Sequence, residues 1–183
     1  MMQEFVKKEM DELERVETTV FREQEKFPLI LVLDQLRSGL NVGSFFRTAD
    51  AMGISGVYCI GYTPVPPHRE VLKTALGSAD GVQWKHFESV SVALESLKKE
   101  GYRIVALEQV HGALFMDEVV SIDCPTALIV GNEVSGVSDE ALKWCDECWE
   151  IRQFGTKHSM NVAVSGGMAI HHWVHLWRKS HGA

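Results

Sequence analysis

The sequence predicts an α/β protein built on an open, mostly parallel sheet with flanking helices. Short apolar runs, typical of strands buried on both faces, recur along the chain. Segments with helical periodicity alternate with these runs, and the loops between them are short. We expect residues 28–183 to form one domain without internal repeats. Residues 1–27 are expected to form a helical extension before it.

The composition is that of an ordinary globular protein, with 45% hydrophobic and 23% charged residues in a chain of 183. No apolar run approaches the roughly 18 residues that a membrane span needs. The first residues are charged with both signs and do not resemble a signal peptide, so we expect a cytoplasmic protein with its four cysteines reduced. A formal net charge of −7 argues against a general nucleic-acid binder, although basic loop residues can still converge on one cleft.

The first elements follow from periodicity and from helix-breaking residues. They are a helix over 4–25, a strand over 29–34, a helix over 41–53 and a strand over 56–61. Pro28 separates the first helix from the first strand. Asn41 is a plausible N-cap of the second helix, and Gly53 is its expected stop. The strand–helix–strand spacing is that of one βαβ unit.

The same alternation continues to the end of the chain. Strands are expected over 82–86, 102–108, 126–131 and 148–151, and helices over 89–100, 138–145 and 161–178. Because parallel strands joined by helices leave loops at one edge of the sheet, ligands are expected beyond the carboxyl ends of the strands. Three polar loops fall at that edge.

The first loop, DQLRSGLNVGSFFRTA, follows the first strand. It contains neither GxGxxG nor GxxxxGK[ST], which makes a dinucleotide-binding or P-loop protein less favoured. Helix capping is the simplest explanation of Asn41 and Gly43. Arg47 lies among apolar and small neighbours, and an arginine buried there would need an anionic partner.

The second loop is GNEVSG at 131–136, where a glycine after a strand lets backbone approach a ligand closely. Glu133 either caps the following helix or pairs with a base. The third segment, FGTKHSMNVAVSGG at 154–167, is a polar loop that enters the last helix. Ser159 or Asn161 can N-cap that helix. Its small residues are expected to let another backbone segment pass close by.

Two further patterns have the spacing of metal ligands. Cys145 and Cys148 form a C-x-x-C pair without a second pair, so we do not expect a zinc site. His171 and His175 share a helix face but lack the HExxH glutamate, and Trp173 and Trp177 share the neighbouring face. A packed or dimer-facing helix is the favoured interpretation, and no metal is expected.

Three motifs, in this order, resemble the SPOUT superfamily, in particular its SpoU or TrmH-like branch of RNA ribose 2′-O-methyltransferases. They are NVGSFFRTADAMGISGVY, ALIVGNEVSGVSDEAL and IRQFGTKHSMNVAVSGGMAI, and the resemblance covers roughly residues 29–175. It implies a C-terminal deep trefoil knot, a feature too rare for general topology rules to propose. It also implies S-adenosylmethionine as the cofactor, a homodimer, and methylation of an RNA 2′-hydroxyl, in tRNA rather than rRNA.

The resemblance also assigns roles by position. The implied catalytic residues are Asn41, Arg47, Glu133, Ser159 and Asn161. The implied cofactor contacts are Gly131, Asn132, Ile151, Phe154, Gly155 and Met160, largely through backbone. A guanidinium is a poor base, so we interpret the arginine as a clamp on an RNA phosphate and a stabiliser of the developing alkoxide.

The third motif departs from the family pattern at three positions. Arg152 stands where a proline is usual, Met160 where a leucine is usual, and Ala163 where a serine is common. These changes bear on cofactor geometry. The competing interpretations are an rRNA methyltransferase, a non-catalytic RNA-binding protein of the same fold, a SPOUT enzyme that modifies a base, and a small-molecule α/β enzyme that uses another nucleotide.

Overall fold

The computed structural model describes residues 5–9, 11–13 and 16–182. Within them, seven strands form one sheet, in the order β3-β2-β1-β6-β4-β7-β5, and every pair of neighbours is parallel. The strands are β1 (Phe27–Asp34), β2 (Ile54–Ile60), β3 (Trp84–Phe87), β4 (Arg103–Leu107), β5 (Leu114–Phe115), β6 (Thr126–Val130) and β7 (Glu147–Glu150). The parallel α/β sheet predicted from the sequence is confirmed.

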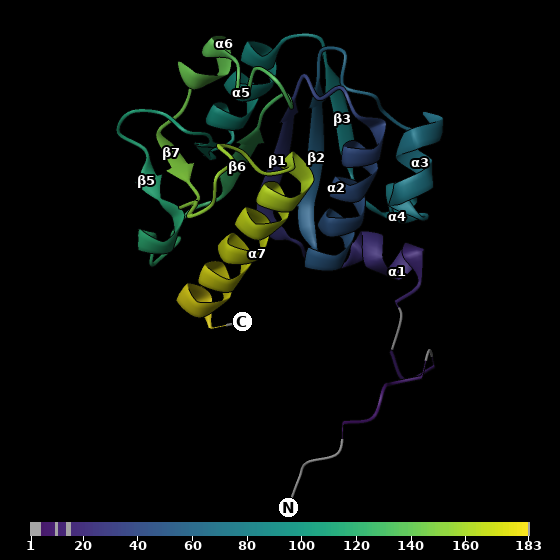
Figure 1. Cartoon of the computed structure of the whole chain (residues 1–183). Helices are drawn as coiled ribbons and strands as arrows, with labels where there is room; N and C mark the ends of the chain where they lie inside the picture. Colours follow the sequence, from purple (N-terminus) through teal and green to yellow (C-terminus); the bar gives the residue numbers. More distant parts are fainter. Residues whose placement is uncertain (1–4, 10, 14–15, 183) are drawn as a thin grey trace, which may run out of the picture.

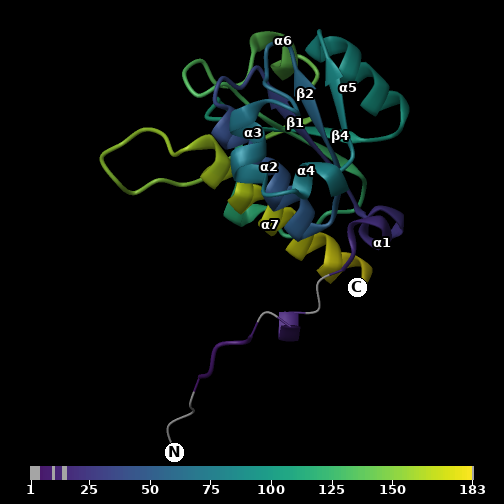
Figure 2. The ribbon, with the colours of Figure 1, turned by 90° about the vertical axis from the view of Figure 1, so that its right-hand side faces the viewer.

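Helices cover both faces of this sheet (Figures 1 and 2). One face carries α2 (Gly39–Met52), α3 (Arg69–Ala75), α4 (Ser78–Gly81) and α7 (Val162–His181). The other face carries α5 (Val90–Lys99) and α6 (Asp139–Leu142). A short helix, α1 (Thr18–Glu23), precedes β1, and two 3₁₀ turns, η1 (Asp11–Leu13) and η2 (Met116–Glu118), complete the elements.

The central strand β1 shows how the sequence divides the core. Its odd-numbered apolar residues, Leu29, Leu31 and Leu33, pack with α2 and α7. Its even-numbered residues, Ile30 and Val32, pack with α5 on the other face. Because successive side chains of a strand point to opposite faces, an unbroken apolar run is what a strand covered on both sides requires.

The predicted N-terminal helix over 4–25 is wrong for most of the part that the structure describes. Only Thr18–Glu23 is α-helical, and Asp11–Leu13 is a single 3₁₀ turn. Residues 4, 10, 14 and 15 of the expected helix lie outside the described residues. Among the apolar side chains of this stretch that the structure describes, Phe5 is 88% exposed and Val16 is 50% exposed. Without an apolar face packed on the domain, good helix formers alone do not hold a helix in water.

The start of α2 also differs from the prediction. Ser38, not Asn41, is the N-cap, and its side chain accepts a hydrogen bond from the backbone N–H of Asn41. Gly53 ends the helix in a left-handed conformation (φ 62°), as expected. Gly43 lies inside the helix rather than at a cap. A β-carbon at Gly43 would lie 2.2 Å from the Val71 carbonyl oxygen, so this glycine lets α2 and α3 cross closely.

None of the described helices is long and apolar enough to span a membrane. The trefoil knot implied by the resemblance stays a prediction.

Candidate active site

A cavity of about 500 Å³ opens at the carboxyl ends of β4, β6 and β7. Its walls come from the loop after β6, from the end of β7 and the chain that follows, and from the first turn of α7. This is where an open parallel sheet binds ligands, because the loops beyond the strand ends leave a crevice. The volume falls within the roughly 300–1,000 Å³ of small-ligand sites.

Most of the residues predicted for the site line this cavity. They are Gly131, Asn132, Glu133, Ile151, Ser159, Met160 and Asn161. Asn41 lies just outside the lining, and its side chain is bonded to two residues of it. The structure places the other predicted residues, Arg47, Phe154 and Gly155, away from the cavity walls.

Three side chains from the three predicted loops meet beside the cavity. Asn41 donates from Nδ2 to Glu133 Oε1 over 2.9 Å, and Asn161 donates from Nδ2 to Asn41 Oδ1 over 3.2 Å. The Glu133 carboxylate also accepts from the backbone N–H groups of Arg37 at 2.9 Å and Ser38 at 3.1 Å. Fold topology has therefore joined polar residues of the first, second and third motifs in one hydrogen-bonded chain.

The environment of Glu133 favours its ionised form. Partial burial alone raises the pKa of this carboxyl, but hydrogen bonds from the Arg37 amide, the Asn41 side chain and the Ser38 amide outweigh burial, so the pKa is lowered. A carboxylate with a lowered pKa and occupied acceptor positions is a poor proton acceptor. Glu133 thus anchors the start of α2. It does not cap the following helix, whose N-cap is Ser138.

The loop after β6 is a closed turn held by its own backbone. Asn132 and Gly136 exchange two backbone hydrogen bonds of 2.9 Å, and Asn132 Oδ1 accepts from the N–H groups of Val134 and Ser135. A β-carbon at Gly131 would lie 2.0 Å from the Gly136 carbonyl carbon. Gly131, predicted to let backbone approach a ligand, therefore lets the backbone of Gly136 pass close by. A side chain at Gly131 would distort this loop.

The segment between β7 and α7 contributes its two ends to the cavity. Its middle projects from the domain as a long loop (Figure 2, yellow-green). Phe154 is 93% exposed there, and, apart from the two chain neighbours of Gly155, none of the described residues comes within 4 Å of a β-carbon built on Gly155. These two residues, expected to contact the cofactor, do not contribute to the cavity in this structure, because the chain bulges outward between Gln153 and His158.

Asn161 both caps the start of α7 and hydrogen-bonds to Asn41. Its Oδ1 accepts from the N–H of Ala163 at 2.9 Å and of Val164 at 3.3 Å, which makes it the N-cap. Of the two candidates for that role, Ser159 and Asn161, the structure therefore selects the second. Its Nδ2 remains available to bond Asn41, so the cap and the polar cluster share one side chain.

Arg47 is not the buried cation that its neighbours in the sequence predict. Its side chain is exposed and lies in a separate groove between α2 and α3, together with Lys73. The reason is helical phase: six residues after Asn41, a side chain at 100° per residue points to a different side of the helix. The buried stripe of α2 is carried by Phe45, Phe46 and Ala49 instead.

Sequence reasoning missed the contribution of the neighbouring strands. Glu108 and Gln109 follow β4, Glu150 ends β7, and all three line the cavity. Gln109 Nε2 donates to Glu150 Oε1 over 3.4 Å. The rule that selects the three loops applies equally to the polar residues at the carboxyl end of the strand predicted over 102–108.

The metal-like patterns are placed apart from this site. Among the described residues, no group of three or more His, Cys, Asp or Glu side chains is arranged to hold a metal ion. Cys145 and Cys148 are free thiols, and burial raises the pKa of the Cys145 thiol to about 12. His171 and His175 are exposed on α7, whereas Trp173 is fully buried and stacks on Trp177 at a ring-centroid distance of 5.1 Å.

Residues 28–171 match a family model described as the SpoU rRNA Methylase family. A 23S rRNA (guanosine-2′-O-)-methyltransferase of Neisseria meningitidis serogroup B is 32% identical over 145 residues, which are 78% of this chain and 56% of that enzyme. A putative TrmH family tRNA/rRNA methyltransferase of Staphylococcus haemolyticus is 27% identical, and the match covers 62% of its length. The chain thus spans under two thirds of these curated relatives.

Two solved structures share this fold. The TrmH/SpoU tRNA modifying enzyme of A. aeolicus superposes with a TM-score of 0.79 at 26% identity, over 90% of this chain and 84% of that one. An AdoMet-bound rRNA methyltransferase from Sinorhizobium meliloti superposes with a TM-score of 0.75 at 25% identity, over 83% of this chain and 58% of that one. The parallel sheet described above is therefore shared with methyltransferases of known structure.

Proposed function

Because the chain belongs to the SpoU rRNA Methylase family, we propose that it transfers a methyl group from S-adenosylmethionine to a ribose 2′-hydroxyl of RNA. The observation that carries this proposal is the hydrogen-bonded chain of Asn41, Glu133 and Asn161 beside a ligand-sized cavity. We assign the reaction to a methyltransferase domain over residues 28–183. The family match over 28–171 supports that assignment.

The cavity suits S-adenosylmethionine in size and in chemistry. Apolar side chains of Leu107, Ile151 and Met160 share its lining with the Glu150 carboxylate and with backbone around Gly131. A flat purine base whose faces suit apolar contact, a hydroxylated ribose and an amino-acid tail call for such a mixture. When bound, this group supplies a methyl carbon activated by a sulfonium. The AdoMet-bound structure of the Sinorhizobium meliloti relative supports the assignment.

The residues of this chain orient the ribose and stabilise the oxygen that attacks. Ser159 and Asn161 line the cavity, and we assign them the hydrogen bonds that orient the 2′-hydroxyl in line with the methyl group. Glu133 keeps Asn41 and the start of α2 in position. We do not assign Arg47 the role of base, because a guanidinium is a poor proton acceptor, and the hydroxyl proton therefore passes to water as the oxygen bonds the methyl carbon. We assign it a bidentate contact with an adjacent RNA phosphate and stabilisation of the developing alkoxide.

We further propose a homodimer in which Arg47 serves the cavity of the partner subunit. In its own chain, Arg47 faces the groove between α2 and α3 and not the cavity. The outward side of α7 exposes Val164 at 56% and Met168 at 42%, and exposed apolar side chains on one helix face are typical of protein contacts. A two-fold interface would place the same surface of both subunits together.

Replacing Arg47 with alanine tests its role. We expect Arg47→Ala to abolish methyl transfer while S-adenosylmethionine binding, measured by calorimetry, stays near that of the wild type. The reason is that the arginine lies outside the cavity and acts on RNA. Loss of cofactor binding together with activity, in a folded variant, would contradict the role assigned.

Mixed dimers test whether Arg47 acts across the interface. Arg47→Ala and Asn161→Ala are each expected to be inactive alone. When the two variants are co-expressed, random pairing makes half of the dimers mixed, and each mixed dimer holds one site with both native residues, so about a quarter of wild-type activity should return. Mixed dimers that form but stay inactive would show that both residues act within one chain.

We propose tRNA as the substrate class, in the cytoplasm. The structural match covers 84% of the A. aeolicus tRNA modifying enzyme but 58% of the Sinorhizobium meliloti rRNA enzyme. All four cysteines lie among the described residues and are unpaired, as a reducing compartment would leave them. The test is transfer of labelled methyl to unmodified tRNA and rRNA pools. Label in tRNA is expected, and label in rRNA alone would favour the competing substrate.

A further inference from the structure

Arg152 is bound on three sides at the point where the chain leaves β7. Its Nε donates toward both carboxylate oxygens of Asp117 at 3.3 Å, and its Nη2 forms an ion pair with Glu118. Its guanidinium carbon lies 3.5 Å from the centroid of the Phe115 ring. A planar cation that stacks on a ring and forks onto two carboxylates makes contacts that a lysine cannot reproduce.

These contacts continue the sheet where its ladder stops. The edge strand β5 pairs with β7 at only two positions, and the last pair is Phe115 with Glu150. Asp117, in the turn η2, and Arg152, in the chain after β7, each lie two residues beyond this last pair, and their side chains meet. Side-chain contacts therefore take over from backbone pairing at the place where the chain turns toward the cavity.

The segment that receives Arg152 is itself firmly held. Met116 and Val119 pack against the hydrophobic core on either side of the two carboxylates. The Val119 carbonyl oxygen lies 3.1 Å from His172 Nε2 on α7. Asp117 and Glu118 thus project from a fixed support and can restrain whatever is bonded to them.

The residues on either side of Arg152 belong to the cavity. Ile151 and Gln153 both line it, while the arginine side chain points to the Phe115–Glu118 segment. Beyond Gln153 the loop projects from the domain, and α7 ends it only at Asn161 (Figure 2). A tie at Arg152 is therefore placed between the rigid sheet and the projecting loop.

We propose that Arg152 is a positioning residue for the cofactor site, which it holds in shape by clamping the start of this loop onto Phe115, Asp117 and Glu118. The inference rests on the proposed function, because it assumes that the cavity takes S-adenosylmethionine. It adds a residue whose side chain does not touch that cavity. Because Arg152 and its acidic partners are partly exposed, the clamp is weakened by salt.

Binding of S-adenosylmethionine by calorimetry, with the melting temperature of each variant, tests the clamp. Arg152→Ala should raise the Kd about five- to tenfold, since exposed ion pairs and cation–π contacts are individually weak but act together here. Arg152→Lys keeps the charge without the fork and should give a smaller rise. The double variant Asp117→Asn with Glu118→Gln keeps the Phe115 contact, so it should raise the Kd less than Arg152→Ala does. Adding Arg152→Ala to it should bring the Kd to the value of Arg152→Ala alone and no higher.

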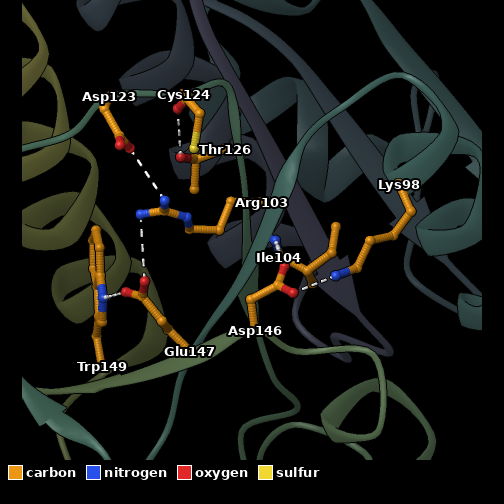
Figure 3. A network of polar contacts seen from close by, with 9 residues as sticks. All are labelled: Lys98, Arg103, Ile104, Asp123, Cys124, Thr126, Asp146, Glu147 and Trp149. Carbon is orange, nitrogen blue, oxygen red and sulfur yellow. Dashed lines mark hydrogen bonds and ion pairs between the residues drawn. The ribbon is translucent and has the colours of Figure 1, made fainter.

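Arg103 offers a matched control at the opposite end of the same sheet. At the start of β4 it forms ion pairs with Asp123 at 3.1 Å and Glu147 at 3.4 Å (Figure 3). It is exposed to a similar degree, with 34% of its side chain accessible against 37% for Arg152. Arg103→Ala should lower the melting temperature and leave the Kd unchanged.

The following results support or overturn the clamp. A Kd that rises in Arg152→Ala and recovers partly in Arg152→Lys, with wild-type binding more sensitive to salt than that of Arg152→Ala, supports the clamp. Equal Kd values for wild type and Arg152→Ala, or an equal rise in Arg103→Ala, would overturn it. A wild-type protein that does not bind S-adenosylmethionine would overturn the proposed cofactor site, and this inference with it.

Discussion

The Glu133 carboxylate is stabilised by the N–H groups that surround it. The backbone amides of Arg37 and Ser38 and the side chain of Asn41 all donate to one carboxylate. Hydrogen bonds to an ionised acceptor are stronger than those to a neutral one, so this carboxylate fixes the entry to α2 more firmly than an amide would. The lowered pKa of Glu133 is the thermodynamic expression of that preference.

Glu133→Gln should therefore lower stability in a pH-dependent way. At neutral pH we expect a loss of about 1 kcal/mol, because an amide NH₂ would face backbone donors. A carboxyl whose folded pKa lies below its ordinary 4.5 contributes stability above that value and loses it as the pH falls through the folded pKa. The gap in melting temperature between wild type and variant should thus be widest at neutral pH and close on acidification. A gap that is constant with pH would contradict this account.

Glu95→Gln provides the control for that measurement. Glu95 forms an ion pair with Lys99 one helix turn away on α5, with both side chains more than half exposed. Exposed pairs of this kind contribute little, so the melting curve of the control should follow that of the wild type at every pH.

At the scale of elements, α2 packs closely against α3 because Gly43 has no side chain at the crossing. A β-carbon on Gly43 would lie 2.2 Å from both Thr74 Oγ1 and the Val71 carbonyl oxygen. Thr74 also donates to the Leu40 carbonyl oxygen, 2.9 Å away, which ties the two helices together. Since α2 carries Asn41 at its start, the crossing also supports the polar cluster.

Two glycine substitutions separate close packing from helix propensity. Gly43→Ala should destabilise the protein by about 2–3 kcal/mol, because backbone must move to admit the methyl group. Gly167→Ala, inside α7, should stabilise it by up to about 1 kcal/mol, since alanine favours helix. Apart from its two chain neighbours and the backbone of its own helix, none of the described residues comes within 4 Å of a β-carbon at Gly167. Equal effects of the two changes in urea denaturation would show that the crossing is not tight.

The elements that could be predicted from sequence are helices with one buried face and strands buried on both faces. The strand runs at 29–34 and 126–131 were correct because parallel pairing and two helical layers require continuous apolar residues. The helix over 4–25 failed because propensity without a packed face does not hold a helix. The two-residue strand β5 was missed, since a ladder of two pairs leaves no periodic signal.

At the scale of the whole molecule, strand order makes the site. The neighbours β1 and β6 bring the loops that carry Asn41 and Glu133 together, and α7 returns Asn161 to the same edge. The three motifs identify these loops. The position of Arg47 along α2 turns its side chain toward the groove between α2 and α3 instead of the cavity. We explain the position of Arg47 outside the cavity by a second subunit, whose cavity it would serve. Periodicity and spacing within one chain do not show which surfaces meet in such a dimer.

The most direct test of the central claim is nucleoside analysis of RNA that the purified protein has methylated with labelled S-adenosylmethionine. We predict that digestion releases the label as a 2′-O-methylated nucleoside, and that Arg47→Ala yields none. Label on a base would contradict the assigned chemistry, and wild-type protein that binds both S-adenosylmethionine and RNA without transferring the methyl group would make it a binding protein.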